Sequence, residues 1–125
     1  MTIEPVNTSA APAPSGGYSQ AIVADRFLLL SGQGPYSPDG SLVDGSIERQ
    51  ARQVFANLQA VAAAAGGSLA RAVRVGVYLS DLAHFDEMDR VYREIFGEPR
   101  PARTTIQTDL VGFHIEADAV VLLGD

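Results

Sequence analysis

The sequence lacks two residue types that carry much of protein chemistry, cysteine and lysine. Without cysteine it has no disulfide, no thiolate nucleophile and no thiolate metal site. All nine basic residues are arginine, which excludes Schiff-base catalysis and the phosphate-binding lysine of a P-loop. The remaining chemistry rests on arginine, carboxylates, hydroxyls, the backbone and two histidines, His84 and His114.

Positive charge is scarce as well. The nine arginines face 15 acidic residues, which gives a net charge of −6. Nucleic-acid backbones and anionic membrane surfaces are bound by positive faces, so we expect neither as a partner. A single buried arginine can still hold a small anion against this overall field.

Long apolar runs are also missing. The run at 61–65, for example, is far too short to span a bilayer. The N-terminal segment contains Glu4 and lacks the unbroken apolar stretch of a secretory signal. We therefore expect a cytoplasmic protein.

The periodicity that is present predicts a single α/β (α+β) domain over residues 1–125. Strands are expected near 3–6, 18–24, 26–31, 72–80, 102–109 and 115–123, and helices near 46–65 and 84–96. The first helix has the clearest limits, because Ser46 is a suitable N-cap and Gly66 a suitable residue to end it.

This order of elements predicts a mixed sheet with two helices packed on one face. The apolar run from Phe27 to Leu30 is expected to be buried on both faces, and Val73, Val75 and Val77 are expected to share one face. A sheet this apolar needs a cover on its other face, and a second subunit is the expected cover.

Arg103 is one candidate for chemistry. It stands at the start of a predicted strand, two residues after Pro101. The proline stiffens the entry and the strand fixes the side chain, so the planar charged fork is suited to hold a carboxylate or phosphate. A surface arginine paired with an aspartate is the alternative.

The last strand carries a second candidate, Glu116, on the same face as His114 and Asp118. A carboxylate in an apolar strand can have a raised pKa and act as a general base or orient a water molecule, and the charge of Asp118 would raise that pKa further. A solvent-facing polar stripe is the alternative. The three residues also raise a metal hypothesis, which is weakened by the spacing of about 7 Å between alternate residues of a strand.

Two further residues stand at positions suited to a pocket. Tyr18 follows a glycine pair and can present its hydroxyl to a ligand, although a core or interface tyrosine fits equally well. Gly32, at the end of an apolar strand, permits a close approach to the backbone.

Taken together, these segments resemble the RidA (YjgF-type) family of reactive-intermediate deaminases. The matching segments cover nearly the whole chain and are, in order, Gly17-Tyr18-Ser19-Gln20, Leu30-Ser31-Gly32-Gln33, Gln50 to Leu58, Val77-Tyr78-Leu79-Ser80-Asp81, Met88 to Phe96, Pro101-Ala102-Arg103-Thr104-Thr105 and Ile115-Glu116-Ala117. The Pro-Ala-Arg-Thr segment, followed downstream by Ile-Glu-Ala, is the most specific of them.

The resemblance implies a chorismate-mutase-like fold and a homotrimer with pockets at the subunit interfaces. It implies hydrolysis of enamines or imines, such as 2-aminoacrylate and 2-iminopropionate, to 2-keto acids and ammonia. Arg103 would clamp the substrate carboxylate, and Glu116 would orient or activate the attacking water. The remaining substrate-binding residues that it implies are Tyr18, Gly32, Asp89 and Thr105. Asp89 stands where many members carry asparagine.

This reaction agrees with the composition, because imine hydrolysis needs neither a metal nor a covalent intermediate. We therefore expect no cofactor and no metal. Two alternatives stay open, a trimeric module that binds a small carboxylate without turnover and a deaminase specialised for one catabolic pathway. A metal-dependent hydrolase that uses His114, Glu116 and Asp118 is a third.

Overall fold

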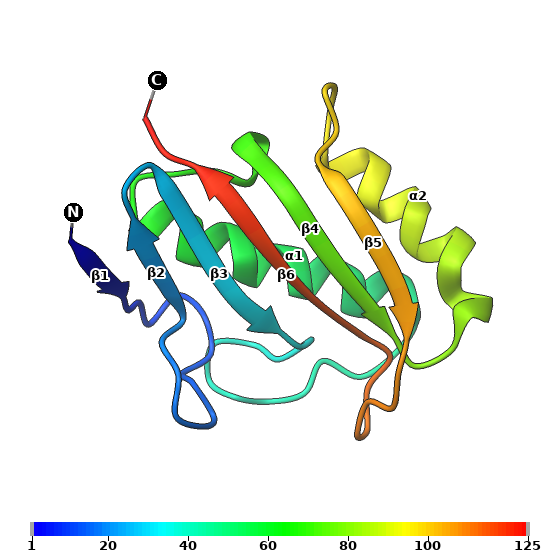
Figure 1. Cartoon of the computed structure of the whole chain (residues 1–125). Helices are drawn as coiled ribbons and strands as arrows, with labels where there is room; N and C mark the ends of the chain where they lie inside the picture. The colour runs from blue at the N-terminus through cyan, green and yellow to red at the C-terminus, as the bar shows by residue number, and fades with distance from the viewer. Residues whose placement is uncertain (1, 125) are drawn as a thin grey trace.

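The computed structural model describes residues 2–124, which form one mixed sheet with two helices packed against it. Figure 1 shows the six strands in the order β1-β2-β3-β6-β4-β5. The elements in chain order are β1 (Ile3–Val6), β2 (Ala21–Ala24), β3 (Phe27–Gln33), α1 (Ile47–Ala64), η1 (Leu69–Arg71), β4 (Ala72–Leu79), η2 (Leu82–His84), α2 (Phe85–Ile95), β5 (Ala102–Gln107) and β6 (Ile115–Leu122). The predicted order of strands and helices is confirmed.

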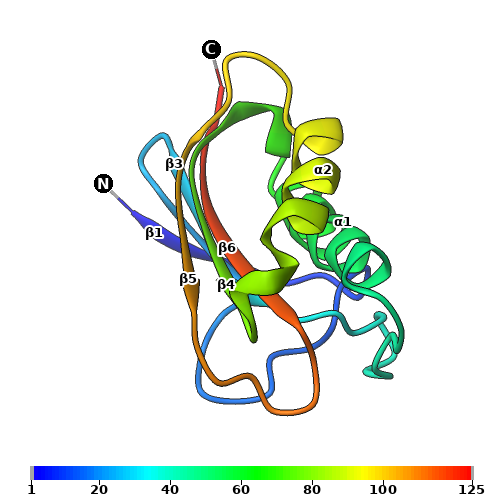
Figure 2. The same cartoon turned by 90° about the vertical axis from the view of Figure 1, so that its right-hand side faces the viewer.

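Both helices lie on the same face of the sheet, as the side view in Figure 2 shows. Strands β4 and β5 pair in parallel and are connected through η2 and α2. The other strand pairs are antiparallel, with β6 between β3 and β4. The predicted mixed sheet with two helices on one face is therefore confirmed. Neither helix of the described chain has the length and apolar character needed to cross a membrane.

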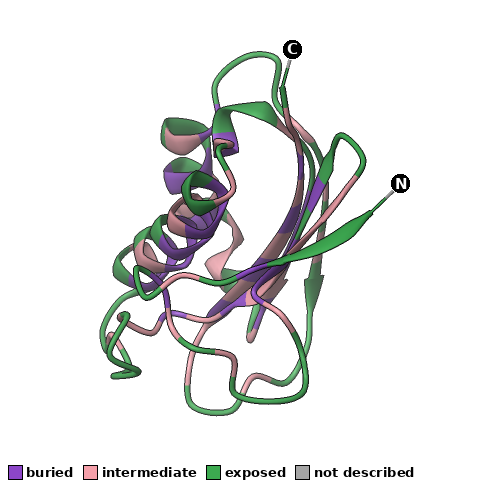
Figure 3. Cartoon of the chain, turned by 90° about the vertical axis from the view of Figure 1, so that its left-hand side faces the viewer, coloured by how far each residue is buried: buried purple, intermediate pink, exposed green. Residues whose placement is uncertain are grey.

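Helix α1 begins and ends where the sequence predicts. The side chain of Ser46 accepts a hydrogen bond from the backbone N–H of Arg49 at 3.2 Å, and Gly66, with a φ of +80°, turns the chain out of the helix. The buried face of α1, which includes Phe55 and Leu58, packs against β3 and β6. Figure 3 shows this buried layer between the helices and the sheet.

Strand β6 carries polar residues on one face only. The residues that it buries against the helices are Ile115, Ala117, Ala119 and Val121. Glu116 and Asp118 therefore point to the opposite face of the sheet, which we call the open face because none of the described helices covers it.

Two sequence predictions about buried residues are wrong. Phe27 and Leu29 are each 45% exposed in the single chain, because only the helix-facing side of β3 is covered. Val73 is 43% exposed, because the register between β4 and β6 shifts at this point and takes Val73 out of the buried alternation that Val75 and Val77 follow.

Candidate active site

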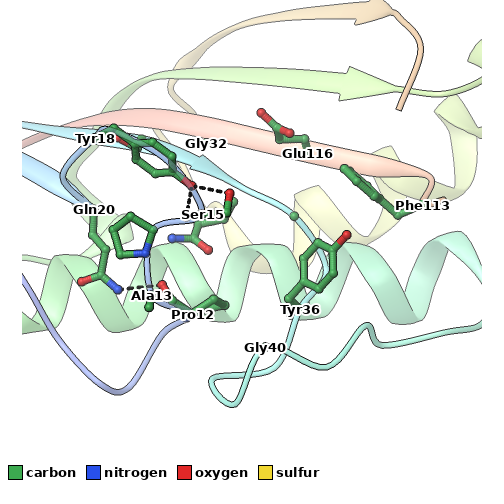
Figure 4. Close-up of a pocket in the computed structure, with 14 residues that line it drawn as sticks. Pro12, Ala13, Ser15, Tyr18, Gln20, Gly32, Tyr36, Gly40, Phe113 and Glu116 are labelled. Carbon is green, nitrogen blue, oxygen red and sulfur yellow. Dashed lines mark hydrogen bonds between the residues drawn. The ribbon is translucent and has the colours of Figure 1, made fainter. Parts of the chain in front are cut away.

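A pocket of about 640 Å³ opens beside the C-terminal end of β3. It lies between the N-terminal loop, the last residues of β3 and the segment that enters β6 (Figure 4). The residues that line it are Pro12, Ala13, Pro14, Ser15, Tyr18, Gln20, Ser31, Gly32, Gln33, Gly34, Tyr36, Gly40, Phe113 and Glu116. Three residues that the sequence analysis selected, Tyr18, Gly32 and Glu116, are thus brought together in one cavity.

The carboxylate of Glu116 lies against β3 at Gly32. A Cβ atom at position 32 would come to 2.5 Å from Oε2 of Glu116 and 3.2 Å from its Cδ, so a larger residue would displace the carboxylate. The close approach predicted at Gly32 is therefore real, and the group that approaches is a side chain of the neighbouring strand. Glycine here fixes where the carboxylate can stand in the pocket.

The electrostatic surroundings of Glu116 suit a proton-transfer group. Burial and, to a lesser extent, the charge of Asp118 raise the pKa of Glu116, in the direction that the sequence predicts. Asp118 accepts a hydrogen bond from the hydroxyl of Tyr78 at 2.9 Å, and this bond raises the pKa of Tyr78. A carboxyl group with a raised pKa can take up and return a proton closer to neutral pH than an ordinary glutamate can.

Tyr18 stands at the rim of the pocket on the side of the N-terminal loop. Its hydroxyl accepts a hydrogen bond from the backbone N–H of Ser15 at 3.1 Å. The loop is fastened by the buried Gln20, whose Oε1 accepts from the N–H of Thr8 at 2.7 Å and whose Nε2 donates to the carbonyl of Pro12 at 2.8 Å. This anchoring holds Tyr18 in place, and its ring remains partly exposed to a ligand.

An aromatic wall formed by Tyr36 and Phe113 was not predicted from the sequence. Their rings meet edge to face with centroids 5.8 Å apart, and both line the pocket. The buried Asn57 of α1 supports this wall, because its Nδ2 donates to the carbonyls of Tyr36 at 2.7 Å and Gly34 at 3.2 Å. Tyr36 and Phe113 lie outside the regular elements, where no periodicity marks them. The one feature of the sequence that could have indicated this wall is the polar Asn57 on the apolar face of α1.

Arg103 belongs to a second cluster, beneath α2 at the edge of the sheet. Its Nη1 donates to Oδ1 of Asp89 at 2.8 Å. Its guanidinium carbon lies 4.4 Å from the ring centroid of Tyr92 and 5.4 Å from that of Phe85. A guanidinium held by one carboxylate and two aromatic rings has a fixed position.

Arg103 and Glu116 lie on opposite faces of the sheet within one chain. Arg103 pairs in register with the buried Val75 and contacts α2, so it faces the helices. Glu116 pairs with Tyr78 on the open face. Because side chains alternate between the two faces along each strand, Arg103 and Glu116 are kept apart. A single chain therefore does not combine them in one site.

The sequence-predicted residues fall into two groups. The first group, in the pocket, consists of Tyr18, Gly32 and Glu116. The second group, beneath α2, consists of Asp89, Arg103 and Thr105. Asp89 is joined to Arg103 by the ion pair described above, and Thr105 shares the helix-facing side of β5 because it follows two residues later.

The metal hypothesis has no ligand set in the described part of the chain. Nδ1 of His114 lies 3.5 Å from Oγ of Ser80, and its ring lies against that of His84 with centroids 5.0 Å apart. Across residues 2–124, no group of three or more histidine, cysteine, aspartate or glutamate side chains is placed to hold a metal ion. His114 thus does not join Glu116 and Asp118 in a cluster.

Comparison with known proteins agrees with the fold. A sequence model of the family described as endoribonuclease L-PSP matches residues 8–122. A RutC family protein of Pyrococcus horikoshii is 47% identical over 105 residues, which cover 83% of each chain. The mitochondrial protein MMF1 of Saccharomyces cerevisiae is 37% identical over 121 residues, 97% of this chain and 83% of the relative.

A solved structure gives the same result in three dimensions. The crystal structure of RidA from an Antarctic Psychrobacter bacterium is similar to this chain with a TM-score of 0.91 and 35% sequence identity, and the match covers 96% of this chain and 99% of that one. The whole arrangement of sheet and helices is therefore shared. Because one relative is mitochondrial, the cytoplasmic location expected from the sequence stays a prediction.

Proposed function

This chain belongs to the L-PSP family that includes RidA, and from that membership and its pocket we propose that it hydrolyses small 2-imino acids and their enamine tautomers. The products would be a 2-keto acid and ammonia, and no cofactor would take part. The observation that carries the proposal is the partly buried Glu116 carboxyl, held at Gly32 and facing a cavity. Family membership itself supports a general role in removing reactive imines and enamines.

The proposed reaction needs one water molecule and one proton carrier. Water attacks C2 of the imine, and the Glu116 carboxylate accepts a proton from the water as the carbon–oxygen bond forms. The same proton is then returned to nitrogen, which gives a carbinolamine. The hydroxyl proton of the carbinolamine passes through the same carboxylate to the amino group, and ammonia leaves as the carbon–nitrogen bond breaks and the carbonyl forms. The imine carbon is already electrophilic, so positioning and proton transfer are the contributions that the protein must make.

The substrate carboxylate is assigned to Arg103, with Asp89 and Thr105 beside it. Since Arg103 faces away from Glu116 within one chain, we infer that a neighbouring subunit supplies Arg103 to the pocket that contains Glu116. Tyr18 and Gly32 would then contact the substrate from the Glu116 side. Each pocket would be incomplete without the neighbour.

The open face supports such an assembly. Phe27 and Leu29 are nearly half exposed there, and Ile106 of β5, which pairs in register with Tyr78, is 43% exposed on the same face. Burying large apolar side chains between subunits is favourable at roughly 25 cal/mol for each Å² removed from water. We propose the homotrimer that the RidA resemblance implies as the form that covers this face.

The description of the family names RNA cleavage, and the charge of this chain favours a different substrate. A phosphate backbone is attracted by a positive surface, whereas this chain has a net charge of −6. A small monocarboxylate requires only the single guanidinium of Arg103. We therefore propose the imino acid, and not RNA, as the substrate.

Competition for an imine tests this function directly. An amino-acid oxidase, with catalase present, generates 2-imino acids that semicarbazide traps, and the purified protein competes with the trap. We expect the wild-type protein to suppress trapping. Arg103→Lys should retain less than about a tenth of the wild-type kcat/KM, because it keeps the charge but loses the planar fork.

Two results separate the alternatives. Glu116→Gln should still bind pyruvate, the product of 2-iminopropionate, while suppressing trapping far less than the wild type does. If the wild-type protein binds pyruvate but suppresses trapping for no parent amino acid, the chain is a binding module and not a deaminase. If Arg103→Lys turns over as fast as the wild type, the role assigned to Arg103 is wrong.

A further inference from the structure

The guanidinium that is assigned to the substrate carboxylate already binds a carboxylate of its own chain. Nη1 of Arg103 donates to Oδ1 of Asp89 at 2.8 Å, and both side chains are largely buried, at 18% and 20% exposed. The ion pair is therefore only weakly screened by solvent. Any anionic ligand at Arg103 must approach next to this negative charge.

Asp89 is itself shared between two arginines. Its Oδ2 accepts from Nε of Arg93 at 2.8 Å, and Arg93 is 65% exposed. The hydrogen bonds from Arg93 and Arg103 lower the pKa of Asp89, so this carboxylate stays ionised throughout the neutral range. The cluster of Arg93, Asp89 and Arg103 thus has a fixed order of charges, positive, negative and positive.

We propose that Asp89 is a built-in competitor that limits how tightly Arg103 holds a ligand carboxylate. This inference rests on the proposed function, because it takes Arg103 as the carboxylate clamp. Asp89 accepts from Nη1 of the guanidinium and offsets its charge, so a monocarboxylate binds through the remaining donors and with reduced affinity.

The proposed reaction gives a reason to limit the affinity of Arg103 for carboxylates. The 2-imino acid and the 2-keto acid product carry the same carboxylate, so an unopposed Arg103 would bind substrate and product equally well. Such uniform binding lowers KM and does not raise kcat, and it would leave the keto acid in the site. A weakened clamp lets the product leave, and this makes Asp89 a determinant of affinity and not a catalytic residue.

Asp89→Asn tests the proposal, because the amide keeps an oxygen that can accept from Arg103 but removes the charge. We expect the dissociation constant of pyruvate, measured by NMR titration, to fall by about tenfold. The KM for 2-iminopropionate should fall in parallel, and kcat should not increase. Asp86→Asn, an equal change of charge at an exposed position of the same helix, is the control and should leave pyruvate binding unchanged.

The Arg93→Gln variant should change the affinity for pyruvate in the opposite direction. Without Arg93, the charge of Asp89 acts on Arg103 alone, so pyruvate should bind several-fold more weakly than to the wild type. If Asp89→Asn leaves pyruvate binding unchanged or weakens it in a wild-type background that binds and hydrolyses, the proposal is wrong and the proposed function stands. If the wild-type protein neither binds pyruvate nor hydrolyses imines, the proposed function fails and this inference fails with it.

Discussion

The carboxylate of Glu116 stands where a side chain at Gly32 would stand. A Cβ atom at position 32 would lie 2.5 Å from Oε2 of Glu116, closer than any ordinary contact between such atoms. Gly32 and Glu116 therefore act as a pair, in which the glycine on β3 sets the position of the carboxylate on β6. The position of the proposed proton carrier depends on the absence of one methyl group.

Gly32→Ala should disable the site and leave the fold largely intact. The methyl group meets the far end of a flexible side chain, which can move aside, so we expect a loss of less than about 1 kcal/mol in the free energy of unfolding. Activity in the trapping assay should fall by at least about tenfold, because a displacement near 1 Å is enough to misplace a proton-transfer group.

Gly97→Ala is the matched control for this prediction. No atom lies within 4 Å of a Cβ built at Gly97, and the residue follows α2 and does not line the pocket. Its activity and its urea midpoint should both match those of the wild type. Full activity in Gly32→Ala would show that the contact between Gly32 and Glu116 does not position the catalytic group.

The pH dependence of the reaction should reveal the interaction between Asp118 and Glu116. Glu116 acts as a base only when ionised, so kcat/KM should rise with pH through its raised pKa. Asp118→Asn removes a negative charge that raises this pKa and leaves the larger effect of burial in place. The rise in kcat/KM should therefore move to lower pH without reaching the position of an ordinary glutamate.

The measurement is the profile of kcat/KM from about pH 5 to pH 9, with Asp109→Asn as the control. Asp109 is exposed and lies outside the pocket, so its variant should keep the wild-type profile. A profile for Asp118→Asn that coincides with that of the wild type, or moves to higher pH, would remove Asp118 from the electrostatics of the site.

The aromatic wall should set the preference for the side chain of the substrate. The pocket volume of about 640 Å³ exceeds what a three-carbon imino acid fills, and Phe113 and Tyr36 offer apolar contact. Phe113→Ala should lower kcat/KM about tenfold for the imino acids derived from leucine and phenylalanine, and much less for the one derived from alanine. Tyr36→Phe, which keeps the ring, should change this ratio little. An equal loss for all three substrates would make Phe113 a structural residue.

Much of the fold could be predicted from local patterns. Helix α1 carries its own signals, with Ser46 at one end, Gly66 at the other and apolar residues at helical spacing between them. Strand β6 alternates so regularly that the shared face of Glu116 and Asp118 is visible in the sequence. These elements are specified by residues that are close together in the chain.

The features that could not be predicted depend on long-range geometry. Whether Arg103 and Glu116 share a face depends on the strand order and on the register through β4, which no local pattern contains. The exposure of Val73 results from a register shift, and the exposure of Leu29 results from the absence of a covering element within the described chain. Phe113 comes from an irregular segment, where periodicity gives no signal.

Mixing two inactive variants tests the central claim, that Glu116 of one subunit acts together with Arg103 of its neighbour. Arg103→Ala retains Glu116, and Glu116→Gln retains Arg103, so each trimer that contains both variants has one pocket with both intact residues. After unfolding and refolding together in equal amounts, about a quarter of the pockets should be complete.

The trapping assay then gives the answer. We predict that each variant alone is nearly inactive and that the co-refolded mixture recovers about a quarter of the wild-type activity, whereas the same proteins refolded separately and then combined recover none at first. A co-refolded mixture that stays as inactive as its components, while wild-type protein refolded in the same way regains its activity, would contradict a site shared between subunits.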